Sequence, residues 1–161
     1  MLRGAGTGLL SEEAQKGLIG ELHLLETLAI PIMGARGAVH AWVGPLDAPK
    51  DFEIGRTAVE VKARRGTANP YVSISSAPQM DESGCDDFFL AVVEVANGVA
   101  SSQAGTTLAE LVDRVRNAMV KTDPAAIEEF ENRLNAAGFR DGDDYTDHRW
   151  IVGPQASYRV E

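Results

Sequence analysis

Two different spacings of apolar residues along the chain predict helices and strands in the same domain. Residues 11–29 predict an amphipathic helix, because their apolar positions fall in one arc at about 100° per residue: Leu18, Leu22, Leu25, Leu28 and Ala29. Ser11 is a suitable N-cap, and Pro31 predicts the end of the helix.

The middle of the chain favours strands. Residues 38–43 predict a strand, and the segments 51–54 and 57–64 predict a hairpin closed by Gly55-Arg56. Further along, we expect a short strand at 71–75, a helix starting at 76–82 and a buried strand at 87–95.

The last third returns to helices and then to strands. Thr107 and Glu110 form a capping box for a helix that reaches about Lys121. A second helix begins after Asp123-Pro124 and ends at Gly138, and two short strands at 149–152 and 156–160 predict a terminal hairpin. This order predicts an α/β fold, with a central mixed sheet flanked by helices.

Composition limits the class of protein. With 161 residues, 44% hydrophobic and 24% charged, the chain has the size and balance of one globular domain, which we take as 1–161. A single cysteine fits a reducing cytoplasm, and no apolar run approaches the roughly 18 residues of a membrane span. The net charge of −9 lies in residues 81–161, so a nucleic acid would have to meet a local basic patch in the balanced first half.

The predicted hairpin brings two acids together. If Gly55-Arg56 is the loop, Asp51 lies opposite Glu60, and Lys62 shares their face. Facing carboxylates repel each other, and a divalent cation such as Mg²⁺ would offset that repulsion.

Glu21 gives a second acidic signal, because it projects between Leu25 and Leu28 inside the apolar arc of the first helix. A carboxylate there is unfavourable unless it is paired. Glu21 either reaches the same cation as the hairpin acids, or lies at the edge of the arc and contacts solvent or an arginine.

The spacing Pro49-Lys50-Asp51, then Glu60-Val61-Lys62, resembles the PD-(D/E)xK signature of restriction-endonuclease-like nucleases. More specifically, the chain looks like a bacterial family of PD-(D/E)xK nucleases whose members are uncharacterised. The matching segments run over most of the chain: residues 17–22, Trp42-Val43-Gly44-Pro45, 51–52, 60–62, 73–79, 106–112, 130–139 and 158–160. Pro-Lys-Asp replaces the usual Pro-Asp, and family members tend to be longer at both ends, which leaves a fragment or short form open.

This resemblance implies a restriction-endonuclease-like fold and a Mg²⁺-dependent phosphodiesterase, with Mn²⁺ as a substitute. Its metal ligands would be Asp51, Glu60, the Val61 carbonyl and, in support, Glu21. Lys62 would orient or help to deprotonate the attacking water and stabilise the charge of the transition state, and Gln79 would hold the water or contact the phosphate backbone.

The implied substrate is nucleic acid, most simply DNA cut in a restriction or defence system. The residues expected to contact it are Lys50, Arg56, Arg64, Arg65, Ser73 and Ser75. The expected partners are a second copy of the chain, because cutting a duplex needs two active sites, and other defence subunits. The alternative is a catalytically inactive, nuclease-like DNA-binding or scaffold subunit.

Overall fold

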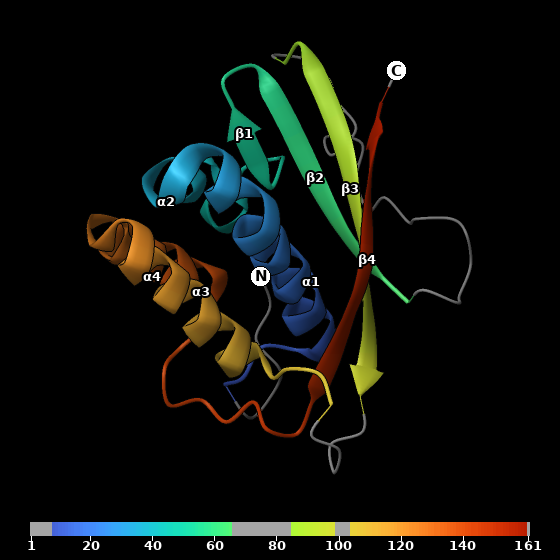
Figure 1. Cartoon of the computed structure of the whole chain (residues 1–161). Helices are drawn as coiled ribbons and strands as arrows, with labels where there is room; N and C mark the ends of the chain where they lie inside the picture. Colours follow the sequence, from blue (N-terminus) through green and yellow to red (C-terminus); the bar gives the residue numbers. More distant parts are fainter. Residues whose placement is uncertain (1–7, 66–84, 99–103, 161) are drawn as a thin grey trace.

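A computed structural model describes residues 8–65, 85–98 and 104–160 of the chain (Figure 1). Its four strands form one mixed sheet in the order β1-β2-β3-β4. The strands are β1 (Phe52–Ile54), β2 (Thr57–Arg64), β3 (Asp87–Gly98) and β4 (Arg149–Arg159). β1 and β4 run antiparallel to their neighbours, while β2 and β3 are parallel.

The described helices lie together on one face of this sheet (Figure 1). Four are α-helical: α1 (Glu12–Leu24), α2 (Ile30–Ala41), α3 (Leu108–Thr122) and α4 (Ile127–Ala137). Shorter turns join them: a π-helix η1 (Leu25–Ala29) and the 3₁₀ turns η2 (Gly44–Leu46) and η4 (Pro124–Ala126). α1 packs directly on β2 and β3, and α3 packs on the other side of α1.

Gly20 allows α1 to approach the sheet closely. A Cβ at Gly20 would lie 3.4 Å from both the Ala63 Cβ and the Val61 Cγ1, so helix and strand are already in contact there. Val61 therefore faces α1, and because side chains alternate along a strand, Glu60 faces the opposite side of β2. This contact also fixes how deeply the next residue, Glu21, is buried between α1 and the sheet.

Several sequence predictions are confirmed. Ile54 pairs with Thr57, which is the predicted hairpin register, and β3 contains the expected buried strand and continues to Gly98. Both halves of the Thr107–Glu110 capping box are formed at the start of α3. α4 ends at Gly138, whose φ of 92° suits glycine.

Two predictions in the first part of the chain are wrong. Pro31 does not end the helix, because the π-helix η1 leads directly into α2 with Pro31 in its first turn, and the backbone departs from helical geometry at Gly34 instead (φ 77°). Residues 38–41 belong to α2 rather than to a strand, and only Trp42 makes an isolated bridge, to Phe52. Ala38, Val39 and Ala41 are buried, and this spacing puts all three on one side of a helix, whereas the neighbours 38 and 39 would face opposite sides of a strand.

The predicted terminal hairpin is also wrong, because β4 is one strand that continues through Gly153-Pro154. A proline is compatible with the position of β4 at the end of the described sheet, where its N–H would have no ladder partner. A shift in register between Val93 and Val95 absorbs the irregularity. The strand expected at 71–75 and the helix expected at 76–82 fall outside the described residues.

The helical stretch Glu12–Ala41, which is kinked at Gly34 (φ 77°), is long and apolar enough, by length and composition alone, to cross a membrane. More than half of its most apolar window, 56%, is buried inside the molecule. Core helices of globular proteins meet the same criterion, so the apolar character of this stretch is explained by its packing on the sheet. The expectation of no membrane contact stays a prediction.

Candidate active site

Asp51 is held between the turn after α2 and strand β2. Its carbonyl oxygen accepts hydrogen bonds from the backbone N–H groups of Val43 (2.9 Å) and Gly44 (3.0 Å), and its own N–H donates to the Val59 carbonyl (3.1 Å). Its side chain takes the place of a strand partner, because Oδ2 accepts from the Val61 N–H at 2.8 Å. Asp51 therefore lies at the edge of the sheet, just before β1.

Glu21 approaches this edge from the helical side. It is buried in α1, and its Oε2 accepts a hydrogen bond of 3.0 Å from the indole Nε1 of Trp42. Burial raises the pKa of Glu21 well above its usual value, and the negative charge of Asp51 and a hydrogen bond shared with the Asp51 carboxyl raise that pKa further. One oxygen of each carboxyl group lies beside Gly44, and the repulsion between the two acids favours a proton or another cation between them.

Glu60 comes from the opposite face of β2 and is also buried. Its Oε1 lies 2.9 Å from the Nζ of Lys62. Burial and the charge of Asp51 raise the pKa of Glu60, while Lys62 and Lys50 oppose that shift. Asp51 therefore acts electrostatically on both Glu21 and Glu60, and the three acids form one charged cluster across the sheet edge.

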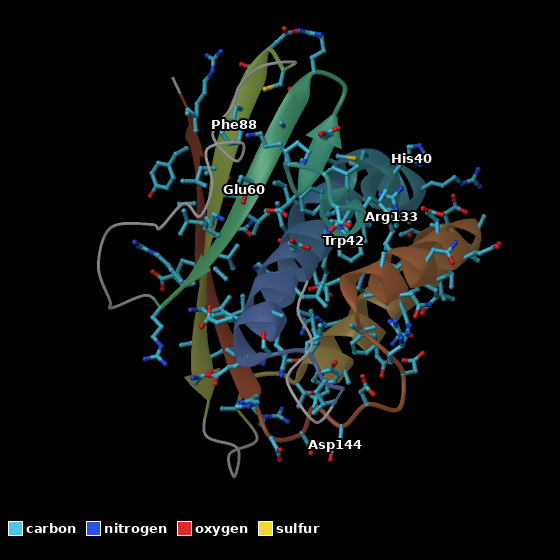
Figure 2. The ribbon with its side chains drawn as sticks, turned by 180° about the vertical axis from the view of Figure 1, so that it is seen from behind. His40, Trp42, Glu60, Phe88, Arg133 and Asp144 are labelled. Carbon is cyan, nitrogen blue, oxygen red and sulfur yellow. The ribbon has the colours of Figure 1, made fainter. Side chains whose placement is uncertain are left out.

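Lys50 lies inside this cluster rather than on the exposed surface. It is only 4% exposed, and its Nζ lies 3.9 Å from the centre of the Phe88 ring in β3. Figure 2 shows Phe88 and Glu60 on the neighbouring strands β3 and β2. The contact of Lys50 with nucleic acid remains a prediction. In this structure the Lys50 ammonium supplies positive charge near Glu60.

The other predicted site residues lie apart from the acids or outside the description. Arg56 pairs with Asp86 at 2.8 Å at the far end of the hairpin, and both are exposed. Arg65 lines a polar cleft of about 130 Å³ near the start of α1, together with Lys16. Arg64 is half-buried at the end of β2. Ser73, Ser75 and Gln79 lie outside the described residues, so their roles stay predictions.

The sequence analysis gave no individual role to Trp42, Gly44 or Arg133. Trp42 is fully buried, and its indole binds Glu21. Gly44 leaves the space beside the acids, and Arg133 of α4 donates to the Trp42 carbonyl. The segment Trp42-Val43-Gly44-Pro45 is one of those that carry the family resemblance, and this resemblance was the one sequence signal that could have indicated a role for Trp42 and Gly44.

Gly44 provides a gap beside two of the carboxylates. A Cβ at this position would lie 2.8 Å from the Asp51 Oδ1 and 3.3 Å from the Glu21 Oε1. These are the oxygens that do not accept the bonds from Val61 and Trp42 described above. The gap is therefore bordered by hard, anionic oxygen atoms, which are the donors that Mg²⁺ prefers.

This donor chemistry fits a divalent cation held by two carboxylates. In the part of the chain that the structure describes, no group of three or more His, Cys, Asp or Glu side chains is arranged to hold a metal ion. Mg²⁺ nevertheless often uses only one or two carboxylates, with water and substrate phosphate oxygens as its remaining ligands. Asp51 and Glu21 are the pair that meets this requirement.

Gly44→Ala is expected to damage this site because its methyl group would press against Asp51. We expect the dissociation constant for Mn²⁺ to rise at least about tenfold, and the free energy of unfolding to fall by about 1 to 2 kcal/mol. Isothermal titration calorimetry and urea unfolding would measure both. Gly17→Ala is the control, since a Cβ there meets no atom within 4 Å and an alanine favours helix α1. Unchanged Mn²⁺ binding in Gly44→Ala would show that the gap is not part of a cation site.

An α/β mixed sheet, with an acid at the start of one hairpin strand and Glu-Val-Lys on the next, defines the restriction-endonuclease-like, PD-(D/E)xK class of folds. Comparison with family models agrees with the structure. The whole chain, residues 1–161, matches the family described as "Putative PD-(D/E)XK family member, (DUF4420)", and the protein belongs to this family. Neither the curated proteins nor the solved structures contain a match to the chain. Nucleases of the PD-(D/E)xK class typically use divalent metals.

Proposed function

We propose that this protein is a Mg²⁺-dependent phosphodiesterase, and specifically a DNA endonuclease of a bacterial defence system. The observation that carries the proposal is that the partly buried carboxyl group of Asp51 and the buried carboxyl group of Glu21 lie side by side at the gap left by Gly44. Such a pair is unfavourable without a cation, and a cation next to a lysine suits the cleavage of a phosphodiester. Membership of the PD-(D/E)xK family supports the same reaction.

In this mechanism Asp51 and Glu21 would hold the ion, while Glu60 keeps its ion pair with Lys62 beside them. A bound divalent cation would supply Lewis-acid chemistry and lower the pKa of a coordinated water. The Val61 N–H fixes one oxygen of Asp51 and Trp42 fixes one oxygen of Glu21, so that each acid keeps a second oxygen for binding.

Lys62 has an electrostatic role in this proposal. Its ammonium is already 2.9 Å from Glu60, in a largely buried position. A fixed positive charge there would orient the scissile phosphate and stabilise the extra negative charge of the transition state. Acting as a base would require a neutral lysine, and the adjacent acids favour the charged form.

The proposal is tested with plasmid DNA and Mn²⁺. Wild-type protein is expected to nick the plasmid, and Asp51→Asn to lose at least about 100-fold in cleavage rate together with most of the calorimetric heat of Mn²⁺ binding. Glu53→Gln is a matched control, because Glu53 is an exposed acid two residues away on β1. Equal, weak heats in wild type and Asp51→Asn would contradict the proposal.

One observation favours the second candidate, an inactive nuclease-like subunit. Within the described segments the carboxylates do not form a three-group metal site, and Glu60 is paired with Lys62 instead. This candidate predicts salt-sensitive retardation of DNA without cleavage at any Mn²⁺ concentration. Metal-dependent nicking by the wild type that disappears in Asp51→Asn would exclude it.

A further inference from the structure

Buried polar contacts reach the acidic cluster formed by Glu21, Asp51 and Glu60 from outside it. One series of contacts connects helix α4 to Glu21, and its members come from three separate elements. Figure 2 shows Arg133 and Trp42 close together between α4 and the end of α2. Both side chains are buried, and both bind polar groups rather than solvent.

The first contact fixes the backbone at Trp42. Arg133 donates from Nη1 to the Trp42 carbonyl, and its Nε donates to Glu129 Oε1 at 2.8 Å, so the guanidinium is held in one orientation. The Trp42 ring lies 5.9 Å from the ring of Phe130, which is also on α4. The end of α2 is thereby attached to α4 through both a polar and an aromatic contact.

The second set of contacts joins Trp42 and the two residues after it to the acids. The Trp42 indole donates to Glu21 Oε2 at 3.0 Å, and the next two residues, Val43 and Gly44, donate their N–H groups to the Asp51 carbonyl. The segment of residues 42–44 therefore holds Glu21 by its side chain and Asp51 by its backbone. A displacement of Trp42 would move both acids at once.

We propose that Trp42 and Arg133 are positioning residues that hold Glu21 and Asp51 ready to bind the divalent cation. The inference rests on the proposed function, because it assigns these residues to the same cation site. The Trp42 N–H holds Oε2 of Glu21, so Oε1 stays beside Gly44 and the carboxyl group does not rotate away from Asp51. Groups that orient metal ligands in this way commonly account for 10-fold to 100-fold in metal affinity.

Trp42→Phe is the sharpest test, because it removes the indole N–H and keeps an aromatic ring against Phe130. We expect its dissociation constant for Mn²⁺, measured by calorimetry, to rise about tenfold over wild type. Trp150→Phe is the matched control. Trp150 is equally buried, but its indole nitrogen has no hydrogen-bond partner among the described residues, so this variant is expected to bind Mn²⁺ as the wild type does.

A spectroscopic measurement provides a second readout that needs no catalysis. The chain has two tryptophans, so Trp150→Phe leaves Trp42 as the single indole. Adding Mg²⁺ to this variant is expected to shift the Trp42 emission with the midpoint found by calorimetry, because the ion would draw charge from the acceptor of the indole N–H. In Trp42→Phe, the remaining emission of Trp150 is expected to stay constant. If Trp42→Phe does not fold, the emission of Trp150→Phe decides the question.

Arg133→Met tests the outer contact of the series. It is expected to raise the Mn²⁺ dissociation constant several-fold, and Arg133→Lys, which keeps one donor for the Trp42 carbonyl, is expected to restore part of the loss. If the wild type binds no Mn²⁺, the proposed function fails. If the wild type binds Mn²⁺ while Trp42→Phe binds equally well and the Trp42 emission does not move, this inference alone is overturned.

Discussion

Glu21→Gln is expected to make the metal-free protein more stable than the wild type at alkaline pH and, at the same time, to impair its binding of Mn²⁺. The physical reason is that the folded protein raises the pKa of Glu21, chiefly through burial and then through the charge of Asp51. An acid with a raised pKa stabilises the fold while it is protonated, and this contribution is lost as the pH rises from the unfolded pKa through the folded one. The glutamine variant has no proton to lose.

The measurement is urea unfolding in a chelator at several values from about pH 5 to about pH 8. The free energy of unfolding of the wild type should decrease with pH, by at most about 1.4 kcal/mol per pH unit for each proton lost, and that of Glu21→Gln should decrease less. Some slope will remain, because the pKa of Glu60 is raised as well. Parallel pH profiles for the two proteins would contradict the prediction. The Mn²⁺ dissociation constant of the variant is expected to rise at least about tenfold.

Lys62→Met is expected to separate metal binding from cleavage. The lysine is the ion-pair partner of Glu60, whose side chain is only 4% exposed, so its removal leaves a buried carboxylate without this charge partner. Breaking a buried ion pair from one side typically costs about 3 kcal/mol of stability or more. Cleavage should fall at least about 100-fold, because the positive charge beside the phosphate is lost. Mn²⁺ should bind as well as before or more tightly, since a cation that repels it is gone.

The double variant Glu60→Gln/Lys62→Met resolves the cause of the instability. It should recover most of the stability lost in Lys62→Met, because it removes the buried charge that had lost its partner, but it should not recover cleavage. Lys121→Met is the control, since Lys121 is an exposed lysine in the last turn of α3, far along the chain from the site. A Lys62→Met protein that cleaves like the wild type would show that this lysine does not assist the reaction.

The parts of the fold set by short-range chemistry were predictable from the sequence. The Gly55-Arg56 turn fixes the hairpin register, and the Thr107–Glu110 box starts α3, because in both cases residues a few positions apart satisfy each other. Pro31 and the terminal strand were not predictable in this way. Pro31 follows a π-helical turn inside a longer helical stretch, and Pro154 lies in a strand at the end of the described sheet, so in both places the surrounding structure accommodates a proline that usually interrupts an element.

In the candidate site, too, the features set by nearby residues were predictable, and those set by the tertiary structure were not. The sequence indicated Asp51, Glu60 and Lys62 through the hairpin, and Glu21 through its place in an apolar arc. It could not indicate that the Asp51 side chain would accept the Val61 N–H at the sheet edge, beside Glu21 of α1. Nor could it indicate the gap at Gly44, since this gap is formed by residues from three separate elements.

The position of β4 has a consequence for shortened forms of this protein. β3 is rich in Phe, Leu and Val, and among the described strands β4 covers the side of β3 that β2 does not. A chain terminated ahead of Arg149 would keep every acid of the cluster, yet it would present the open edge of β3 to other chains. Such an edge recruits further strands. We therefore expect a protein truncated ahead of Arg149 to aggregate, even though it keeps the acidic residues of the site.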